Sequence, residues 1–215
     1  MTEVKKRGRK PQVKKESKFT LNKVDDKLFF DAQVNAGFTT THYDGLVTLH
    51  ENGAKSMINA NVKSVFELGS GLGFFLVGAS RVGLDAHGYD INPIERDFAL
   101  SKGISPERYV LGDGIELNLD RHYDACYCVE VAEHITDDAL EYIFTQVIDK
   151  CEQLFFTSTP NHADGDADWG HINIKSKEEW VYFMASIGYD YVEDWRTVTE
   201  WGLRFKRKNN YVKRK

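Results

Sequence analysis

The sequence predicts an α/β protein with a Rossmann-like, mostly parallel sheet of seven strands and helices on both faces. Three observations lead to this prediction: short apolar runs alternate with helical segments from residue 64 onward, a glycine cluster follows the first run, and an aspartate follows each of the next two. Strand–helix–strand units build parallel sheets that helices cover. Such sheets bind ligands at the carboxyl ends of their strands, where the glycines and acids fall here.

The seven expected strands are short apolar runs bounded by polar or glycine-rich residues. The first is typical of a buried parallel strand. The last two are separated by a short turn, which predicts an antiparallel hairpin at the C-terminal end of the sheet. The expected strands are 64–68, 84–89, 108–111, 123–129, 153–157, 189–198 and 203–208.

The expected helices lie between these strands, over 73–82, 92–102, 137–151 and 176–187, with further helices in 25–60 before the first strand. Asn92 and Pro93 are a helix cap followed by a proline in the first turn. Ser176 and Glu179 have the spacing of a capping box, and Gly188 ends that helix. The polar loop 161–170 is expected to be a mobile lid over the substrate.

Composition is that of an ordinary globular protein, since 41% of the 215 residues are hydrophobic and 28% are charged. No apolar stretch approaches the length of a membrane span, and the N-terminus lacks a secretory pattern. Cys126, Cys128 and Cys151 have no metal-type spacing and lie in apolar segments. We therefore expect buried thiols in a reducing compartment, the cytoplasm, and no membrane partner.

Charge divides the chain into an acidic body and basic ends. Residues 1–20 carry eight Lys/Arg and two Asp/Glu, and 203–215 carry seven Lys/Arg and no acid, whereas 21–202 carry 13 basic and 31 acidic residues. We expect a disordered basic tail over 1–20, a folded domain over 21–208 and a basic C-terminal tail over 209–215. The segment 6–11 loosely resembles an AT-hook, so the tails either bind nucleic acid or only keep the protein soluble.

The turn after the first strand is the first chemical signature. It reads Glu67-Leu68-Gly69-Ser70-Gly71-Leu72-Gly73, an acid followed by glycines that alternate with other residues. Glycines allow a tight turn and a close approach of backbone to ligand, and a helix N-terminus follows with free N–H groups. A dinucleotide-binding loop would need glycine at position 74, which is Phe74.

This turn resembles the first motif of the class I S-adenosylmethionine-dependent methyltransferases, and the resemblance extends in order over residues 60–208. It implies that Asp90 accepts hydrogen bonds from the ribose hydroxyls and that Asp113 receives the adenine amino group, with Ile115 beside the ring. The full set of cofactor-binding residues that it implies is Glu67, Gly69, Ser70, Gly71, Gly73, Asp90, Ile91, Asp113, Gly114 and Glu130.

The fourth strand leads into Glu130-Val-Ala-Glu133-His134, and a Gly-His pair containing His171 follows downstream. This pattern resembles the methyltransferases with a Glu-His fourth motif, which include ubiquinone-biosynthesis O-methyltransferases and Hen-type small-RNA 2′-O-methyltransferases. That resemblance implies a divalent ion (Mg, Mn or Zn) on Glu130, Glu133, His134 and His171. Two alternatives remain open: a metal-free catalytic set of Glu133, His134 and His171, and a purely structural role.

An oxygen of a small hydroxylated metabolite is the first choice of methyl acceptor, because bases follow the fourth strand, and nitrogen is the second. The Asn/Asp-Pro-Pro-aromatic motif of nitrogen-methylating DNA and protein enzymes is missing from the sequence. A nucleic acid or nucleotide methylated on its 2′-oxygen is the alternative that the basic ends favour. A non-catalytic, cofactor-binding scaffold with nucleic-acid-binding tails is the third reading.

Overall fold

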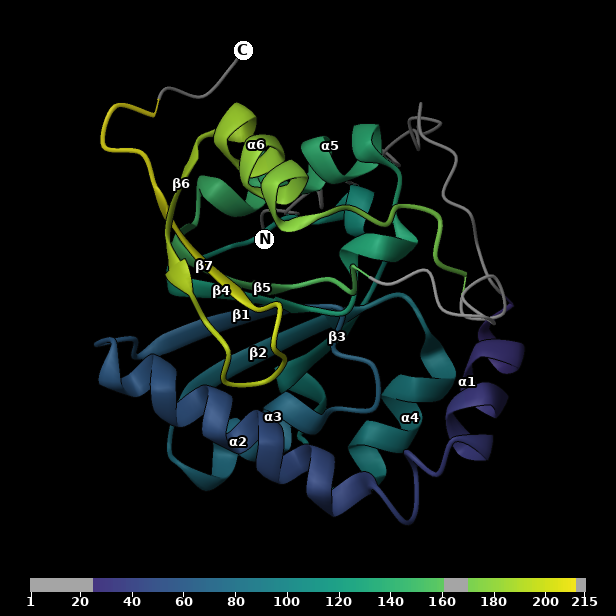
Figure 1. The fold of residues 1–215 in the computed structure, drawn as a ribbon. Coiled ribbons are helices and arrows are strands. Elements are labelled where there is room, and N and C mark those ends of the chain that lie inside the picture. Colours follow the sequence, from purple (N-terminus) through teal and green to yellow (C-terminus); the bar gives the residue numbers. More distant parts are fainter. Residues whose placement is uncertain (1–24, 161–169, 212–215) are drawn as a thin grey trace, which may run out of the picture.

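A computed structural model describes residues 25–160 and 170–211, which form one seven-stranded sheet with helices on both faces (Figure 1). The strand order is β3-β2-β1-β4-β5-β7-β6. The predicted tail 1–20, most of the predicted lid and the last four residues of the predicted C-terminal tail lie outside the described residues. None of the helices in the described ranges has the length and apolar character of a membrane span.

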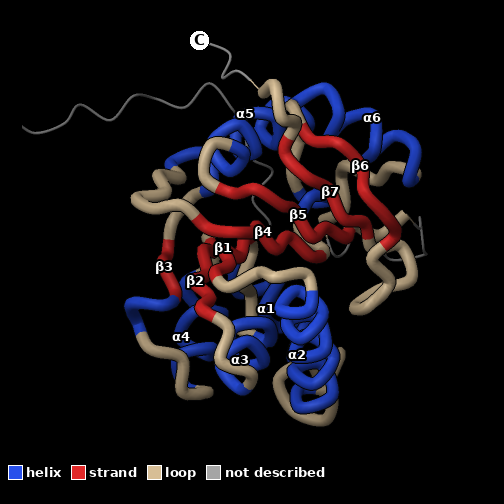
Figure 2. Tube along the Cα trace, turned by 90° about the vertical axis from the view of Figure 1, so that its left-hand side faces the viewer, coloured by secondary structure: helices blue, strands red, loops and turns tan. Residues whose placement is uncertain are grey.

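The first five strands run parallel, and the last two pair antiparallel, as the alternating pattern and the predicted hairpin require. Figure 2 shows the strands as one layer, with α5 and α6 on one side and α1 to α4 on the other. Strands β2 and β3 are added on one side of the central strand β1, and β4 and β5 are added on its other side. Ligands bind at such a switch in strand order, which here lies between β1 and β4. The strands are β1 (Ser64–Leu68), β2 (Asp85–Asp90), β3 (Tyr109–Leu111), β4 (Tyr123–Val129), β5 (Cys151–Thr157), β6 (Tyr189–Asp194) and β7 (Leu203–Arg207).

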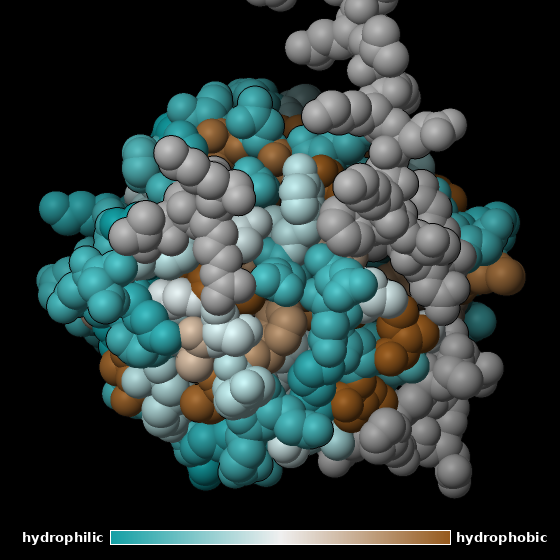
Figure 3. Space-filling view, turned by 90° about the horizontal axis from the view of Figure 1, so that it is seen from above, coloured by the Kyte–Doolittle hydropathy of each residue, from teal (hydrophilic) through white to brown (hydrophobic). Residues whose placement is uncertain are grey.

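Two apolar cores fill the space between the sheet and its helices. One lies under α5 and α6, and the other under α2 and α3 (Figure 1). The outer face over α5 and α6 is mostly hydrophilic in its described part (Figure 3). The helices are α1 (Asp26–Asn35), α2 (Tyr43–Asn59), α3 (Phe74–Arg81), α4 (Pro93–Ser101), α5 (Asp137–Ile148) and α6 (Lys177–Ile187), with 3-10 turns at Pro106–Arg108, Gly114–Glu116 and Ala132–His134.

The predicted caps of two helices are confirmed. The Asn92 side chain accepts hydrogen bonds from the backbone N–H groups of Ile94 and Glu95, and Ser176 and Glu179 form both halves of a capping box. Two elements were predicted to extend three or four residues too far. Helix α5 ends at Ile148, because β5 already begins at Cys151, and the strand predicted over 189–198 ends at Asp194, where the turn toward β7 begins.

The three cysteines are buried free thiols. Cys126 and Cys128 point from β4 into the core under α5 and α6, and Cys151 joins the same core from β5. Burial raises the pKa of all three thiols, so they remain protonated apolar groups. This agrees with the prediction that they are core residues.

Candidate active site

The turn after β1 keeps its shape through glycines in the left-handed region. Gly69, Gly71 and Gly73 have φ of 76°, 47° and 79°. A Cβ added at Gly69 would lie 2.2 Å from Cγ2 of Val131, so the turn packs directly against the segment after β4. Gly73 is the N-cap of α3 and supplies no side chain to it, which leaves N–H groups of the first helical turn available to a ligand.

Asp90 ties this turn to the end of β2. Its Oδ2 accepts a hydrogen bond of 2.8 Å from the backbone N–H of Gly71, and its Oδ1 accepts one of 2.8 Å from the N–H of Asn92. Burial raises the pKa of the Asp90 carboxyl, and the backbone donors oppose that rise. Each carboxylate oxygen has a second lone pair, which leaves Asp90 able to accept from a diol.

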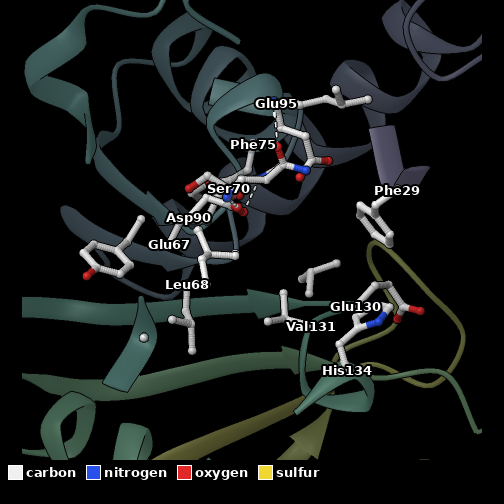
Figure 4. A pocket seen from close by; sticks show the side chains of 18 of the residues that line it. Phe29, Glu67, Leu68, Ser70, Phe75, Asp90, Glu95, Glu130, Val131 and His134 are labelled. Atoms are coloured by element: carbon white, nitrogen blue, oxygen red, sulfur yellow. Dashed lines mark hydrogen bonds between the residues drawn. The ribbon is translucent and has the colours of Figure 1, made fainter. Parts of the chain in front are cut away.

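Glu95 is a second buried acid at this end of the cavity, and sequence reasoning missed it. It is 3% exposed on α4, and its Oε1 accepts a hydrogen bond from the Gln33 side chain of α1. Burial, and then the charge of Asp90, raise the pKa of Glu95 to about 8. Figure 4 shows Glu95, Asp90 and Ser70 grouped on one side of the cavity.

Glu67 is the acid that precedes the glycines, and it is 4% exposed. Its Oε2 has no hydrogen-bond partner among the described residues, and burial raises its pKa well above the usual range. It pairs in register with Tyr127 of β4. A buried carboxylate with an unused oxygen needs a cation or a donor when it ionises, which a ligand can supply.

Asp113 follows β3 and caps the 3-10 turn Gly114–Glu116, since its Oδ1 accepts a hydrogen bond of 3.1 Å from the N–H of Ile115. The Tyr89 hydroxyl donates to the backbone carbonyl of Asp113 at 3.0 Å. Asp113, Gly114 and Ile91 all line the cavity that holds Asp90. The predicted cofactor residues at the ends of β2 and β3 therefore face one shared space.

Glu130 adopts a backbone conformation that is rare for its residue type, with φ of 54°. Its Oε1 accepts hydrogen bonds from the Thr157 hydroxyl at 2.7 Å and from the Trp201 indole at 2.9 Å. Both donors come from outside the fourth motif: Thr157 ends β5, and Trp201 lies in the turn before β7. Trp201 is thus a further site-supporting residue that carries no sequence signature.

Glu133, His134 and His171 form a compact cluster, with one ligand-type atom of each within 4.8 Å of the others. The rings of His134 and His171 lie 4.8 Å apart in an edge-to-face arrangement. Glu133 is fully buried, and neither of its carboxylate oxygens has a hydrogen-bond partner among the described residues. Burial, followed by the charge of Glu130, raises the pKa of Glu133 well above the usual range.

Backbone contacts bring His171 to this cluster. The N–H groups of Ile172 and Asn173 both donate to the carbonyl of Glu133, at 2.8 and 2.9 Å. The Asn173 side chain donates to the carbonyl of Ile135 and to the carboxylate of Asp137. Of the four predicted metal ligands, the fold therefore gathers three, while the Oε1 of Glu130 is directed to Thr157 and Trp201.

One cavity of about 720 Å³, at the carboxyl ends of the parallel strands, is lined by the acids and imidazoles described above: Glu67, Asp90, Glu95, Asp113, Glu130, Glu133, His134 and His171. Figure 4 shows Glu130, Val131 and His134 across the cavity from Asp90 and Ser70, with Phe29 of α1 beside His134. The predicted motif residues supply most of the polar lining. The segment before β1 supplies a second set that sequence reasoning missed, because no spacing marks these residues: Asp26, Phe29 and Gln33 of α1, Phe38 of the turn that follows, and Leu46 and His50 of α2.

Comparison with known proteins agrees with this geometry. Residues 66–147, which run from β1 to α5, match the family model of a methyltransferase domain. This part of the chain is thus identified as a methyltransferase domain. The methyltransferase has no match among curated protein sequences.

Solved structures share the fold of this methyltransferase at low sequence identity. Mitomycin 7-O-methyltransferase MmcR has a TM-score of 0.63 at 14% identity, and the match covers 84% of this chain but only 60% of that one. Magnesium protoporphyrin IX methyltransferase from Synechocystis PCC 6803, solved with S-adenosylmethionine, has a TM-score of 0.57 at 16% identity over 88% of this chain and all of that one. Streptomyces venezuelae DesVI has a TM-score of 0.63 at 12% identity, over 86% and 99%.

Proposed function

We propose that this methyltransferase transfers the methyl group of S-adenosylmethionine to an oxygen of a small hydroxylated metabolite. The observation that carries the proposal is the position of Glu133, His134 and His171 on the same cavity as the glycine turn and Asp90. A methyl donor bound by the turn would thus have bases beside it. Alignment and a deprotonated acceptor are what the protein must supply, because the sulfonium already activates the methyl group.

The acids of the cavity support binding of this donor. Among the described residues that line it, seven carry carboxyl groups, and none is a lysine or an arginine. The sulfonium and the ammonium group of the donor are both cations, and a nearby cation favours the ionised form of carboxyl groups whose pKa burial has raised. In this proposal Asp90 accepts from the ribose hydroxyls, Asp113 receives the adenine amino group, and Glu67 faces the ammonium group.

The bases act on the acceptor. As the acceptor oxygen bonds to the methyl carbon, the carbon–sulfur bond breaks and its electron pair stays on sulfur. His134 or His171 takes the hydroxyl proton, and the carboxyl group of Glu133, which lies within 4.8 Å of both rings, stabilises the imidazolium that forms. S-adenosylhomocysteine and the methyl ether are the products.

Single substitutions test the proposed role of the two histidines as bases. His134→Ala and His171→Ala should each lower methyl transfer by roughly 10²- to 10⁴-fold, the usual contribution of a general base. Their affinity for S-adenosylhomocysteine should stay within about twofold of wild type, and the exposed His122→Ala serves as the control. Full methyl transfer by both variants on a panel of hydroxylated acceptors would contradict the proposed bases.

A divalent ion at the same cluster is a second candidate that one observation favours. Two imidazoles and a buried carboxylate without hydrogen bonds are a donor set suited to Mn, Fe or Zn. Glu133, His134 and His171 would hold the ion, which would lower the pKa of the acceptor hydroxyl. Calorimetric binding of Mn²⁺ by wild type but not by Glu133→Gln, with activity lost in EDTA and restored by Mn²⁺, would support this version. Full activity in EDTA, without Mn²⁺ binding, would refute it.

A nucleic-acid acceptor is the weaker candidate, because it depends on the basic ends while the described cavity lining is acidic. If it were correct, binding of an oligonucleotide would fall steeply with salt, and deleting residues 1–20 would reduce that dependence. Methyl transfer to a small hydroxylated compound by a protein lacking residues 1–20, at the wild-type rate, would favour the metabolite instead.

A further inference from the structure

His50 reaches the cavity from α2 and forms a hydrogen bond with a fully buried tyrosine. Its Nδ1 lies 2.7 Å from the hydroxyl oxygen of Tyr127 in β4. Tyr127 is held rigidly, since its ring stacks on Phe75 with centroids 3.9 Å apart and meets Trp195 edge-on. Neither His50 nor Tyr127 belongs to a motif that the sequence marks.

This hydrogen bond fixes which nitrogen of His50 carries the proton. Burial raises the pKa of Tyr127 well above the usual range, so its hydroxyl keeps its hydrogen and needs an acceptor. Burial lowers the pKa of His50 to about 4, so the ring is neutral near pH 7. Tyr127 therefore donates to Nδ1, and His50 carries its hydrogen on Nε2. Among the described residues, Nε2 has no hydrogen-bond partner of its own.

The register of the sheet places this donor at one end of the cavity. Tyr127 pairs with Glu67 across β4 and β1, and paired residues of parallel strands point to the same face. Asp113 follows β3, which is three strand positions from β4, or roughly 14 Å at the usual spacing. His50 thus lies toward the Glu67 end of the cavity, away from the proposed adenine site.

We infer that His50, oriented by Tyr127, donates its Nε2–H to the carboxylate of the amino-acid arm of the methyl donor. The inference rests on the proposed function, which puts the ammonium group of that arm beside Glu67. A carboxylate entering a cavity with seven acids needs a donor, and the described lining has no lysine or arginine to serve. His50 supplies a neutral donor there without adding a charge, and it makes the site select ligands with an amino-acid arm.

Two ligands that differ only in this arm test the inference. S-adenosylhomocysteine has the arm, whereas 5′-methylthioadenosine has a methyl group in its place. His50→Ala should weaken calorimetric binding of S-adenosylhomocysteine by about 10- to 100-fold, as expected for a lost hydrogen bond to a charged group. Binding of 5′-methylthioadenosine should stay within about twofold, which also shows that the variant is folded.

Two further variants separate the donor from its orientation. His50→Gln keeps an N–H near the position of Nε2 and should recover part of the lost affinity. Tyr127→Phe keeps the ring that stacks on Phe75 but frees Nδ1, so the preference for S-adenosylhomocysteine should shrink by a smaller factor. The exposed His122→Ala should change neither ligand.

Each other outcome overturns the inference in a distinct way. Equal weakening of both ligands by His50→Ala would show that His50 has only a structural role. Unchanged binding of both ligands would show that His50 does not contact the amino-acid arm. If the wild-type protein bound neither ligand, the proposed function itself would fail. Wild-type binding of both ligands separates that failure from failure of the His50 assignment alone.

Discussion

Replacing Glu95 by glutamine should stabilise the protein at alkaline pH and leave its stability nearly unchanged at acidic pH. Glu95 is buried on α4 beside Asp90, and its pKa is raised to about 8 by burial and by that charge. In the unfolded chain the same carboxyl titrates near 4.5. Between these two values the folded protein holds a proton that the unfolded chain has released, so stability falls as pH rises through this window and is constant above it.

The size of the effect follows from the same two values. Each pH unit in the window costs about 1.4 kcal/mol, so the full span from pH 4.5 to pH 8 costs about 5 kcal/mol. A glutamine carries no charge, and its amide oxygen can still accept from Gln33. Burying the amide costs about as much as burying the protonated carboxyl of wild type, so this polar cost cancels between the two proteins. Glu95→Gln should therefore gain about 5 kcal/mol at pH 8 and close to zero at pH 4.5.

Urea unfolding at pH 4.5 and pH 8 measures this difference directly. The exposed Glu200→Gln is the matched control, and it should change stability by less than about 0.5 kcal/mol at both pH values. A Glu95→Gln protein that is no more stable than wild type at pH 8, or equally stabilised at both pH values, would refute the assignment of a buried, costly acid. This destabilising acid lies beside the proposed ribose site, and buried acids with shifted pKa values commonly occur at functional sites.

Two further predictions concern the glycine turn and the segment that carries His171. Gly69→Ala should destabilise the protein by about 1–3 kcal/mol more than Gly83→Ala, because both have φ near 75° but only the Cβ at position 69 meets Val131; equal losses in urea unfolding would show that the turn does not pack there. Asn173→Ala removes the side-chain bonds to Ile135 and Asp137, so methyl transfer should drop about tenfold or more with S-adenosylhomocysteine affinity nearly unchanged. A parallel loss of affinity would mean that Asn173 supports the cofactor end instead.

The parts of the site at the strand ends could be predicted from the sequence, because strand period and parallel pairing force those ends together. Asp90 and Asp113 follow adjacent strands and line one cavity, as expected. Glu133, His134 and His171 also lie together, as the Glu-His motif and the later Gly-His pair led us to expect. The backbone hydrogen bonds that bring His171 there carry no sequence signal. The roles of these side chains toward ligands remain predictions.

The helices before β1 could not be assigned to the site from sequence. Gln33 and His50 are single polar residues on helices, and a helical pattern alone does not say which face meets a distant sheet edge. Trp201 reaches Glu130 from a turn that separates two strands of the hairpin, a contact between residues far apart in the chain. Such contacts are decided by tertiary packing, which local patterns do not encode.

Calorimetric titration of the intact protein with S-adenosylhomocysteine tests the central claim most directly. The claim is that the glycine turn, Asp90 and Asp113 together hold an adenosyl group. We expect saturable binding of one ligand per chain, which Asp90→Ala weakens by tenfold or more. Protein that is folded by circular dichroism but gives no binding, or binding that Asp90→Ala leaves unchanged, would contradict it.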